Sequence, residues 1–201
     1  MSTRRFVRRP PYSTRGAVAI LSWACLLAAL GRAQAHPFSI DQANDTDPPQ
    51  GGYNIPIASP VGQEFVPTMN RLDVVELQMN AQSPFIGGDA MVQIRSDSIV
   101  GPILGASQTV TIPPIVLPLT LAHFDFASPV PLTPGALYVI EVISLTSNLG
   151  VFGTGLGDDY PPGRAIAFGQ PTEFDLWFRE GTAQPVSVEP STWGRIKTEY
   201  R

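Results

Sequence analysis

The segment "DAMVQIRSD" (89–97) decides the fold class of this chain of 201 residues. Apolar and polar side chains alternate along it, and a period of two places them on opposite faces of an extended strand. The two faces would carry Ala90, Val92 and Ile94 on one side and Met91, Gln93 and Arg95 on the other. The segment therefore predicts a β-strand with one face on a core and the other toward water.

Three further segments predict strands of the same domain. Residues 74–80 ("VVELQMN") alternate in the same way, and residues 119–127 ("LTLAHFDFA") place two phenylalanines on one face. Residues 136–145 ("ALYVIEVISL") are apolar on both faces and rich in β-branched side chains, which is typical of a central strand covered on each side. The inward residues would be Val75, Leu77, Met79, Phe124 and Phe126, with Glu76 and Gln78 facing outward.

Turn-forming residues separate these segments. The chain contains 21 prolines and 18 glycines, and after the first 35 residues they recur too often for long helices. Short strands with turn signals roughly every eight to twelve residues indicate an all-β protein. We therefore predict an antiparallel two-sheet sandwich of the jelly-roll kind over residues 36–181, with the polar segment 41–52 as a surface loop.

The two ends of the chain predict an exported protein. Residues 1–35 combine a basic start, the apolar run 17–30 and the small residues "AQA" at 33–35, which is the pattern of a signal peptide with a helical core. Cleavage would follow Ala35, so that His36 begins the mature chain. Residues 182–201 are expected to form a linker and a short amphipathic tail, and the mature chain carries no predicted transmembrane segment.

Charge and cysteine content limit the function classes. Six of the 13 Lys and Arg residues lie in residues 1–35 and none of the 17 Asp and Glu residues do, so the mature chain has seven basic residues and a net charge of −10. A negative charge of this size argues against nucleic acid and anionic membranes as partners. The single cysteine, Cys25, is also in the leader, which excludes disulfides and zinc–thiolate sites from the mature chain.

The stretch "FGQPTEFDLWFREG" (168–181) contains the strongest candidate binding residues. As one strand over 174–179 it would turn Asp175, Trp177 and Arg179 outward, and with Tyr160 they would form a face for stacking on a sugar ring. The alternative is structural: Arg179 lies over the indole as a cation–π contact and pairs with Asp175. The structural alternative is the simpler prediction, because no other residue pattern demands a ligand there.

Other groups of polar residues predict weaker candidate sites. Asp41, Asn44, Asp45 and Asp47 offer oxygen ligands for calcium, although their spacing is not that of an EF-hand, and the alternative is a hydrated loop with no cofactor. Asp158 and Asp159 would supply a carboxylate to a small glycoside hydrolase, or lie in a solvated turn. His123 and Asp125 would share a strand face without a nucleophile beside them, so we expect His123 to be a satisfied structural histidine.

Several turn-plus-strand motifs carry a resemblance to a known family. "VGQEFVP", "LDVVELQM", "GPILG", "LTPGALYVIEV" and "FDLWFREG" follow one another over residues 38–181. In this succession the chain resembles the bacterial secreted β-sandwich modules called choice-of-anchor domains, which are frequent in exported proteins with a PEP-CTERM sorting signal. The chain departs from that pattern at "STWGRIKTEYR" (191–201), which has no apolar span. The resemblance implies a fold and a location and no activity.

The sequence as a whole predicts a non-enzymatic protein. We expect a structural or adhesion-type β-sandwich module, secreted, periplasmic or on the cell surface, whose partner is a glycan or an envelope or matrix component. The first alternative is a carbohydrate-binding module that uses the face around Trp177. The second is the small glycoside hydrolase with Asp158 or Asp159.

Overall fold

A computed structural model of the chain describes residues 36–146, 148–157 and 159–184. The predicted signal peptide (1–35), the tail beyond Gln184 and Asp158 lie outside the described residues. Within them the chain is almost entirely β, with one short helix, α1 (Ile55–Ala58), whose N-cap Asn54 accepts a hydrogen bond from the backbone of Ile57. The prediction of an all-β domain is confirmed.

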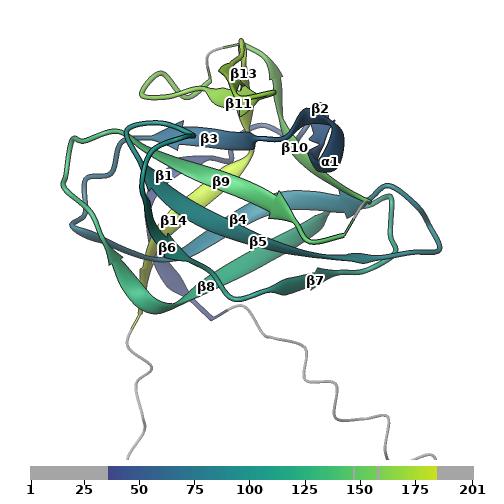
Figure 1. Ribbon diagram of the computed structural model, residues 1–201, viewed down its shortest axis with the longest axis horizontal. Helices are drawn as coiled ribbons and strands as arrows, with labels where there is room; N and C mark the ends of the chain where they lie inside the picture. The colour runs from purple at the N-terminus through teal and green to yellow at the C-terminus, as the bar shows by residue number, and fades with distance from the viewer. Residues whose placement is uncertain (1–35, 147, 158, 185–201) are drawn as a thin grey trace, which may run out of the picture. The chain divides into compact units, whose positions relative to one another are not determined.

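The strands form two antiparallel sheets of seven strands each, which lie face to face (Figure 1). The first sheet contains, in order, β1 (Phe38–Asn44), β14 (Phe178–Ala183), β4 (Arg71–Ala81), β10 (Leu149–Leu156) and β13 (Phe174–Leu176), with β2 (Gly51–Asn54) paired to β10 and β8 (Thr120–Pro131) paired to β4. The second contains β12 (Gln170–Pro171), β11 (Ala165–Ala167), β3 (Val61–Phe65), β9 (Tyr138–Ser144), β5 (Gly88–Ser96) and β6 (Ile103–Ala106), with β7 (Val110–Ile112) paired to β5.

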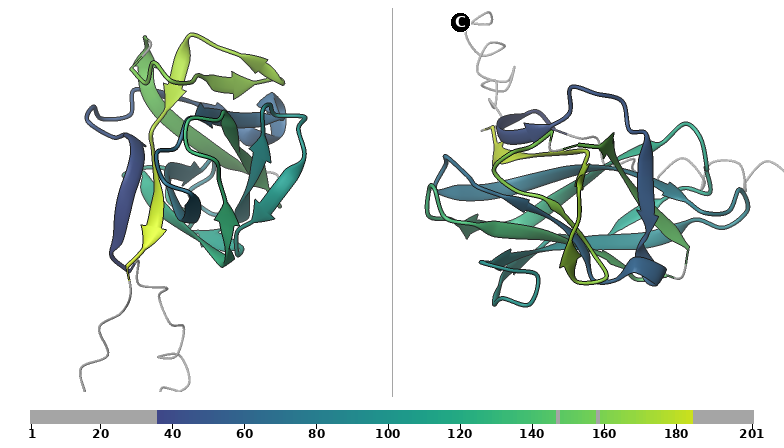
Figure 2. Two further views of the ribbon diagram at one scale, coloured as in Figure 1. Left: turned by 90° about the vertical axis from the view of Figure 1, so that its left-hand side faces the viewer. Right: turned by 90° about the horizontal axis from the view of Figure 1, so that it is seen from above.

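The first and last strands of the domain pair with each other. β1 and β14 run antiparallel and lie side by side in both views that show them clearly (Figures 1 and 2). β14 continues to Ala183, past the predicted end of the domain at Gly181. The segment 41–52, predicted as a loop, lies partly in β1 and β2, because its first residues pair with β14 and its last with β10. No helix in the described part of the chain is long and apolar enough to cross a membrane.

The core lies between the sheets and confirms most of the predicted inward residues. Ala90, Val92 and Ile94 on β5 are fully buried, as are Val75, Leu77 and Met79 on β4 and Phe124 on β8. β9 is a central strand, between β3 and β5, and Val139 on its outer side packs with Ile99 and Ile166. Both faces of this strand are therefore covered, as predicted.

The prediction of a wet outer face on β4 is correct only in part, because Gln78 is partly exposed but most of that face is covered. Val74 and Glu76 on that side are buried. The reason is the position of β4 in the sheet: it pairs with β14 along one edge and with β8 along the other, and side chains from both neighbours close over it. The resulting layer on the outside of the first sheet holds the candidate site.

Candidate functional site

Three residues that lie far apart in the sequence are directly opposite one another on the outer face of the first sheet. Glu76 on β4 is the register partner of both Arg179 on β14 and His123 on β8. Glu76 Oε1 lies 3.0 Å from His123 Nδ1, and the other carboxyl oxygen lies 3.5 Å from Arg179 Nη1. Arg179 Nε donates to Asp45 at 2.6 Å. The strand register thus builds a continuous row of charged groups that ends at an imidazole.

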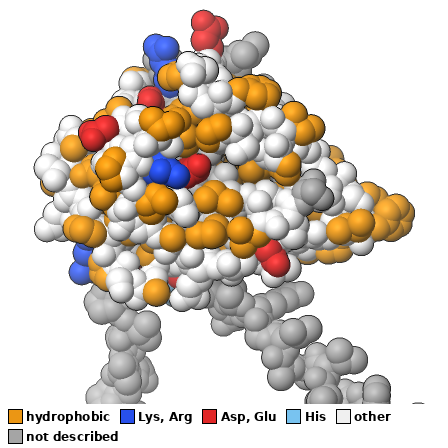
Figure 3. Space-filling model, in the orientation of Figure 1, with side chains coloured by type: hydrophobic (Ala, Val, Ile, Leu, Met, Phe, Trp, Pro, Cys, Tyr) orange, Lys and Arg blue, Asp and Glu red, His pale blue; other side chains and the backbone are white. Residues whose placement is uncertain are grey.

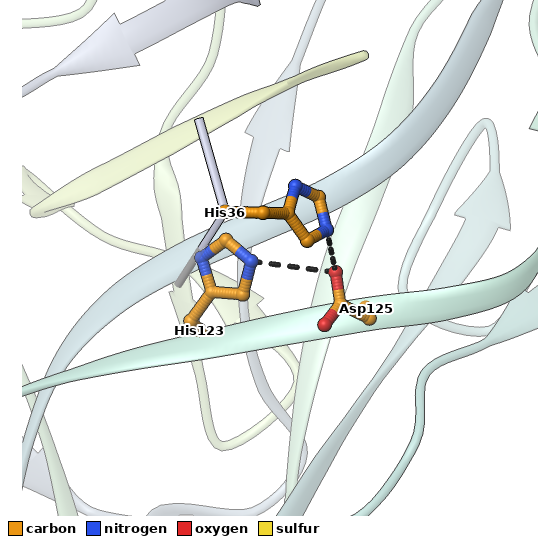
Figure 4. A group of neighbouring side chains, drawn as sticks. All are labelled: His36, His123 and Asp125. Atoms are coloured by element: carbon orange, nitrogen blue, oxygen red, sulfur yellow. Dashed lines mark hydrogen bonds and ion pairs between the residues drawn. The ribbon is translucent and has the colours of Figure 1, made fainter. Parts of the chain in front are cut away.

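The far side of this imidazole faces a second histidine and a carboxylate (Figure 4). Oδ1 of Asp125, two residues along β8 from His123, lies 2.8 Å from His36 Nε2 and 3.3 Å from His123 Nε2. The two rings meet edge to face with centroids 5.2 Å apart, and Phe38 packs on His123 from the same side. We call these three residues, His36, His123 and Asp125, the His–His–Asp cluster.

The two ring nitrogens of His123 are held differently. Its Nδ1 bonds to Glu76, and this bond raises the pKa of His123 above its usual value against the opposing effect of partial burial. Its Nε2 is buried and lies 3.3 Å from Asp125 Oδ1, an ion-pair distance, without a hydrogen bond of standard geometry among the described residues. The prediction of a satisfied structural histidine agrees with the bond at Nδ1, whereas Nε2 has an ion-pair contact and no hydrogen bond of standard geometry among the described residues. Buried polar atoms without a partner are rare enough to need an explanation.

The cluster opens onto a surface hollow of about 500 Å³. His36 and Asp125 line it together with Gln108, and an ion pair between Arg71 and Asp73 forms another part of its wall. The side chain of His123 is only 11 % exposed, whereas His36 and Asp125 are each about a third exposed. A small solute can therefore reach the two exposed members from water while the third is held in place behind them.

The predicted binding face around Trp177 is buried. Trp177 is 6 % exposed, Asp175 1 %, and Tyr160 is also covered. The single strand expected over 174–179 is in fact two: β13 pairs with β10 up to Leu176, and β14 begins at Phe178 and pairs with β4 and β1. Because the chain changes partners at Trp177, side chains on both sides are covered, and these residues form no exposed sugar-binding surface.

The structural alternative for this stretch is correct in one part and wrong in another. Arg179 does lie over the Trp177 ring, with its guanidinium carbon 4.9 Å from the ring centroid. Its ion-pair partners are Asp45 and Glu76, however, and not Asp175. Asp175 instead accepts hydrogen bonds from the Gln63 side chain and the Tyr160 backbone, each at 3.0 Å. Gln63 belongs to β3, so this pair ties the two sheets together.

The four candidate calcium ligands do not converge. Asp41 accepts hydrogen bonds from the backbone of Thr68 and Met69 at 2.8 and 2.9 Å, and although partial burial opposes ionisation, these bonds and the Thr68 hydroxyl lower its pKa. Asn44 donates to Thr154 and to the Leu176 carbonyl, Asp45 binds Arg179, and Asp47 is exposed. Asp41, Asn44 and Asp45 each bind a different part of the domain, which is why the spacing in sequence does not become a site.

The candidate catalytic carboxylates Asp158 and Asp159 do not form a recognisable site among the described residues. Asp159 is exposed in a turn, and Asp158 lies outside the described residues. Among the described histidines and acids, the group whose ligand atoms all lie within 4.8 Å of one another is the His–His–Asp cluster.

The sequence shows each of the three residues of this cluster but not that they come together. The sequence signal that could have pointed to the cluster is the pair His123 and Asp125, spaced two apart on one strand. The pairing of β1 with β14, which carries the start of the domain to this face, has no local signature. No family model matches the chain, and neither curated proteins nor solved structures show a significant similarity to it.

Proposed function

We propose that this protein is an exported, non-enzymatic β-sandwich module that attaches to an apolar surface on a protein of the bacterial envelope. The proposal includes removal of residues 1–35 before His36 and jelly-roll connectivity of the sandwich. It is supported by the charge pattern of the leader and by the resemblance to choice-of-anchor domains. The structural observation that carries it is an exposed apolar end of the sandwich.

The apolar end consists of two loops that lie together at one end of the sandwich. It is made of Phe85, Ile86, Ile115, Val116 and Leu117. Figure 3 shows hydrophobic side chains gathered at the narrow end of the molecule. Phe85 is 88 % exposed, and Ile86 and Leu117 are also well over half exposed. Single exposed apolar side chains are common, but a contiguous group of them is typical of an interaction surface.

The loops of the apolar end are held in place by hydrogen bonds at their bases. The amide nitrogen of Ala81 donates to the Ile115 carbonyl at 3.3 Å, and the Asn80 side chain donates to the Val116 carbonyl at 2.9 Å. The Asn148 side chain donates to the carbonyl of Ile86 at 2.9 Å. The apolar side chains are thus presented outward by anchored backbone, which lowers the entropic cost of binding.

The test is retention of the full chain on isolated bacterial envelope fragments. We expect the double variant Phe85→Asp, Ile86→Asp to lose at least tenfold in binding, because burying two charged side chains in an apolar contact is strongly unfavourable. The matched control is Val100→Asp, since Val100 is 83 % exposed in the turn at the other end of β5. Equal binding of the double variant and the control would contradict the proposal.

Two further measurements test whether the partner is a protein or the lipid membrane, and whether the chain has enzymatic activity. Binding to lipid vesicles made without envelope protein, at the strength seen with envelope fragments, would replace the proposed protein partner with the membrane itself. Turnover of glycan or peptide substrates by the purified chain would contradict the non-enzymatic part of the proposal.

A further inference from the structure

We propose that the His–His–Asp cluster binds one divalent transition-metal ion of the zinc class, through Nε2 of His36, Nε2 of His123 and Oδ1 of Asp125. This site is independent of the apolar end, because it lies on the outer face of the first sheet and uses none of the same residues.

The spacing of the three ligand atoms fits such an ion. Zinc bonds of about 2.0–2.1 Å to imidazole nitrogen and carboxylate oxygen place neighbouring ligands of a tetrahedral site roughly 3.3 Å apart. His123 Nε2 already lies 3.3 Å from Asp125 Oδ1, and His36 Nε2 lies 2.8 Å from the same oxygen. All three ligand atoms lie within 4.8 Å of one another, and the His36 ring, which precedes β1 and is partly exposed, is the one that can adjust to the spacing of such a site.

The buried nitrogen of His123 is the second observation that points to an ion. Nε2 is shielded from water and has no hydrogen bond of standard geometry in the described part of the chain. It is directed toward Asp125 and His36 (Figure 4). A bound cation would satisfy this atom and would also neutralise Asp125 between the two rings.

The carboxylate bonded to the second ring nitrogen of His123 is an arrangement typical of metal-binding histidines. Glu76 bonds to Nδ1, which fixes the ring orientation and the tautomer with Nε2 free to bind a cation. Glu76 is itself held by Arg179, which is anchored by Asp45 and by the Trp177 ring. The row of charged groups therefore acts as an outer layer that holds one ligand rigid while the other two remain accessible.

The ligand set selects the class of metal. Two imidazole nitrogens and one carboxylate suit zinc and copper, whereas calcium and magnesium require oxygen ligands. Three protein ligands beside a surface hollow leave a fourth position for water or a small anion. The site is thus of the open type.

The experiment is a calorimetric titration of the full chain, prepared without a polyhistidine tag, with Zn(II). We expect one ion per chain and at least a tenfold loss of affinity in His36→Ala, His123→Ala and Asp125→Asn. The matched control is Asp47→Asn, which removes an exposed carboxylate from the loop between β1 and β2 and should leave the affinity unchanged. Calcium added in place of Zn(II) should produce no comparable heat.

His36→Ala keeps the test decisive if another variant fails to fold. His36 precedes β1, and its described contacts are confined to the cluster and its neighbour Pro37, so its removal should leave the circular dichroism spectrum unchanged. Unchanged zinc affinity in a folded His36→Ala chain would overturn the proposal. So would zinc binding that is weakened by Asp47→Asn to the same extent as by the three ligand variants.

Discussion

The stretch around Trp177 is predicted as the candidate binding site and His123 of the His–His–Asp cluster as a structural residue, and the structure favours the opposite assignment. The former has the sequence of a binding site, and the structure packs it as a corner between β13 and β14. The latter contains a histidine expected to be structural, and the structure places His36 and Asp125 beside its buried Nε2. Alternation therefore assigns a side chain to a face only while the strand keeps the same neighbours.

Replacement of Trp177 by alanine tests whether this side chain is structural. Trp177→Ala should lower the free energy of unfolding by about 3–5 kcal/mol, because a large buried side chain leaves a cavity and Arg179 loses the ring beneath it. Denaturation with urea measures the change, and Trp177→Phe, which keeps an aromatic ring, should lose much less. A melting temperature unaffected by Trp177→Ala would restore the interpretation of this residue as an exposed ligand contact.

Glu180, the next residue after Arg179 on β14, has a buried carboxyl group whose ionisation should make the stability of the fold depend on pH. Burial, and then the charge of Asp41, raises the pKa of the Glu180 carboxyl to about 9. Between its ordinary pKa of 4.5 and that value, the folded chain holds a proton that the unfolded chain releases. The stability linked to this proton is therefore present at low pH and is lost as the pH rises toward 9.

Glu180→Gln should remove that dependence, because the amide does not ionise. The unfolding free energy of the variant, relative to that of the parent chain, should rise with pH by at most about 1.4 kcal/mol per unit, the value for one proton. Urea denaturation at mildly acidic and mildly alkaline pH measures the slope, with the exposed Glu173→Gln as a control that should not alter it. Parallel curves for Glu180→Gln and the parent would show that Glu180 is already ionised in the fold.

The sequence predicts those features that depend on local pattern. The inward faces of β4, β5 and β8 follow from alternation, and the double covering of β9 follows from its apolar run. The sequence does not predict the features that depend on the register between strands distant in the chain. Glu76 is buried because it faces His123 and Arg179, 47 and 103 residues away in the chain. His36 joins His123 because β1 pairs with β14, which no local motif encodes.

Glu76 connects the two regions, and its replacement should change the properties of the chain least. Its carboxylate bonds to His123 on one side and approaches Arg179 above the Trp177 ring on the other. As a positioning residue that touches no ion itself, it should matter less than the three ligands. We expect Glu76→Gln to weaken zinc binding by about tenfold, at the low end of the effect of such outer partners on metal affinity.

A readout of ligand geometry separates positioning from a general loss of stability. Co(II) bound in place of zinc reports its coordination through visible absorption bands, and Glu76→Gln should shift or broaden them because His123 is no longer fixed by a charged partner. Asp73→Asn is the matched control: Asp73 is a carboxylate on the wall of the same hollow, paired with Arg71 and not with a ligand. The prediction is contradicted if both variants weaken zinc binding equally and the Co(II) spectrum stays unchanged. In that case the negative charge near the hollow attracts the ion, and the orientation of His123 by Glu76 does not contribute to affinity.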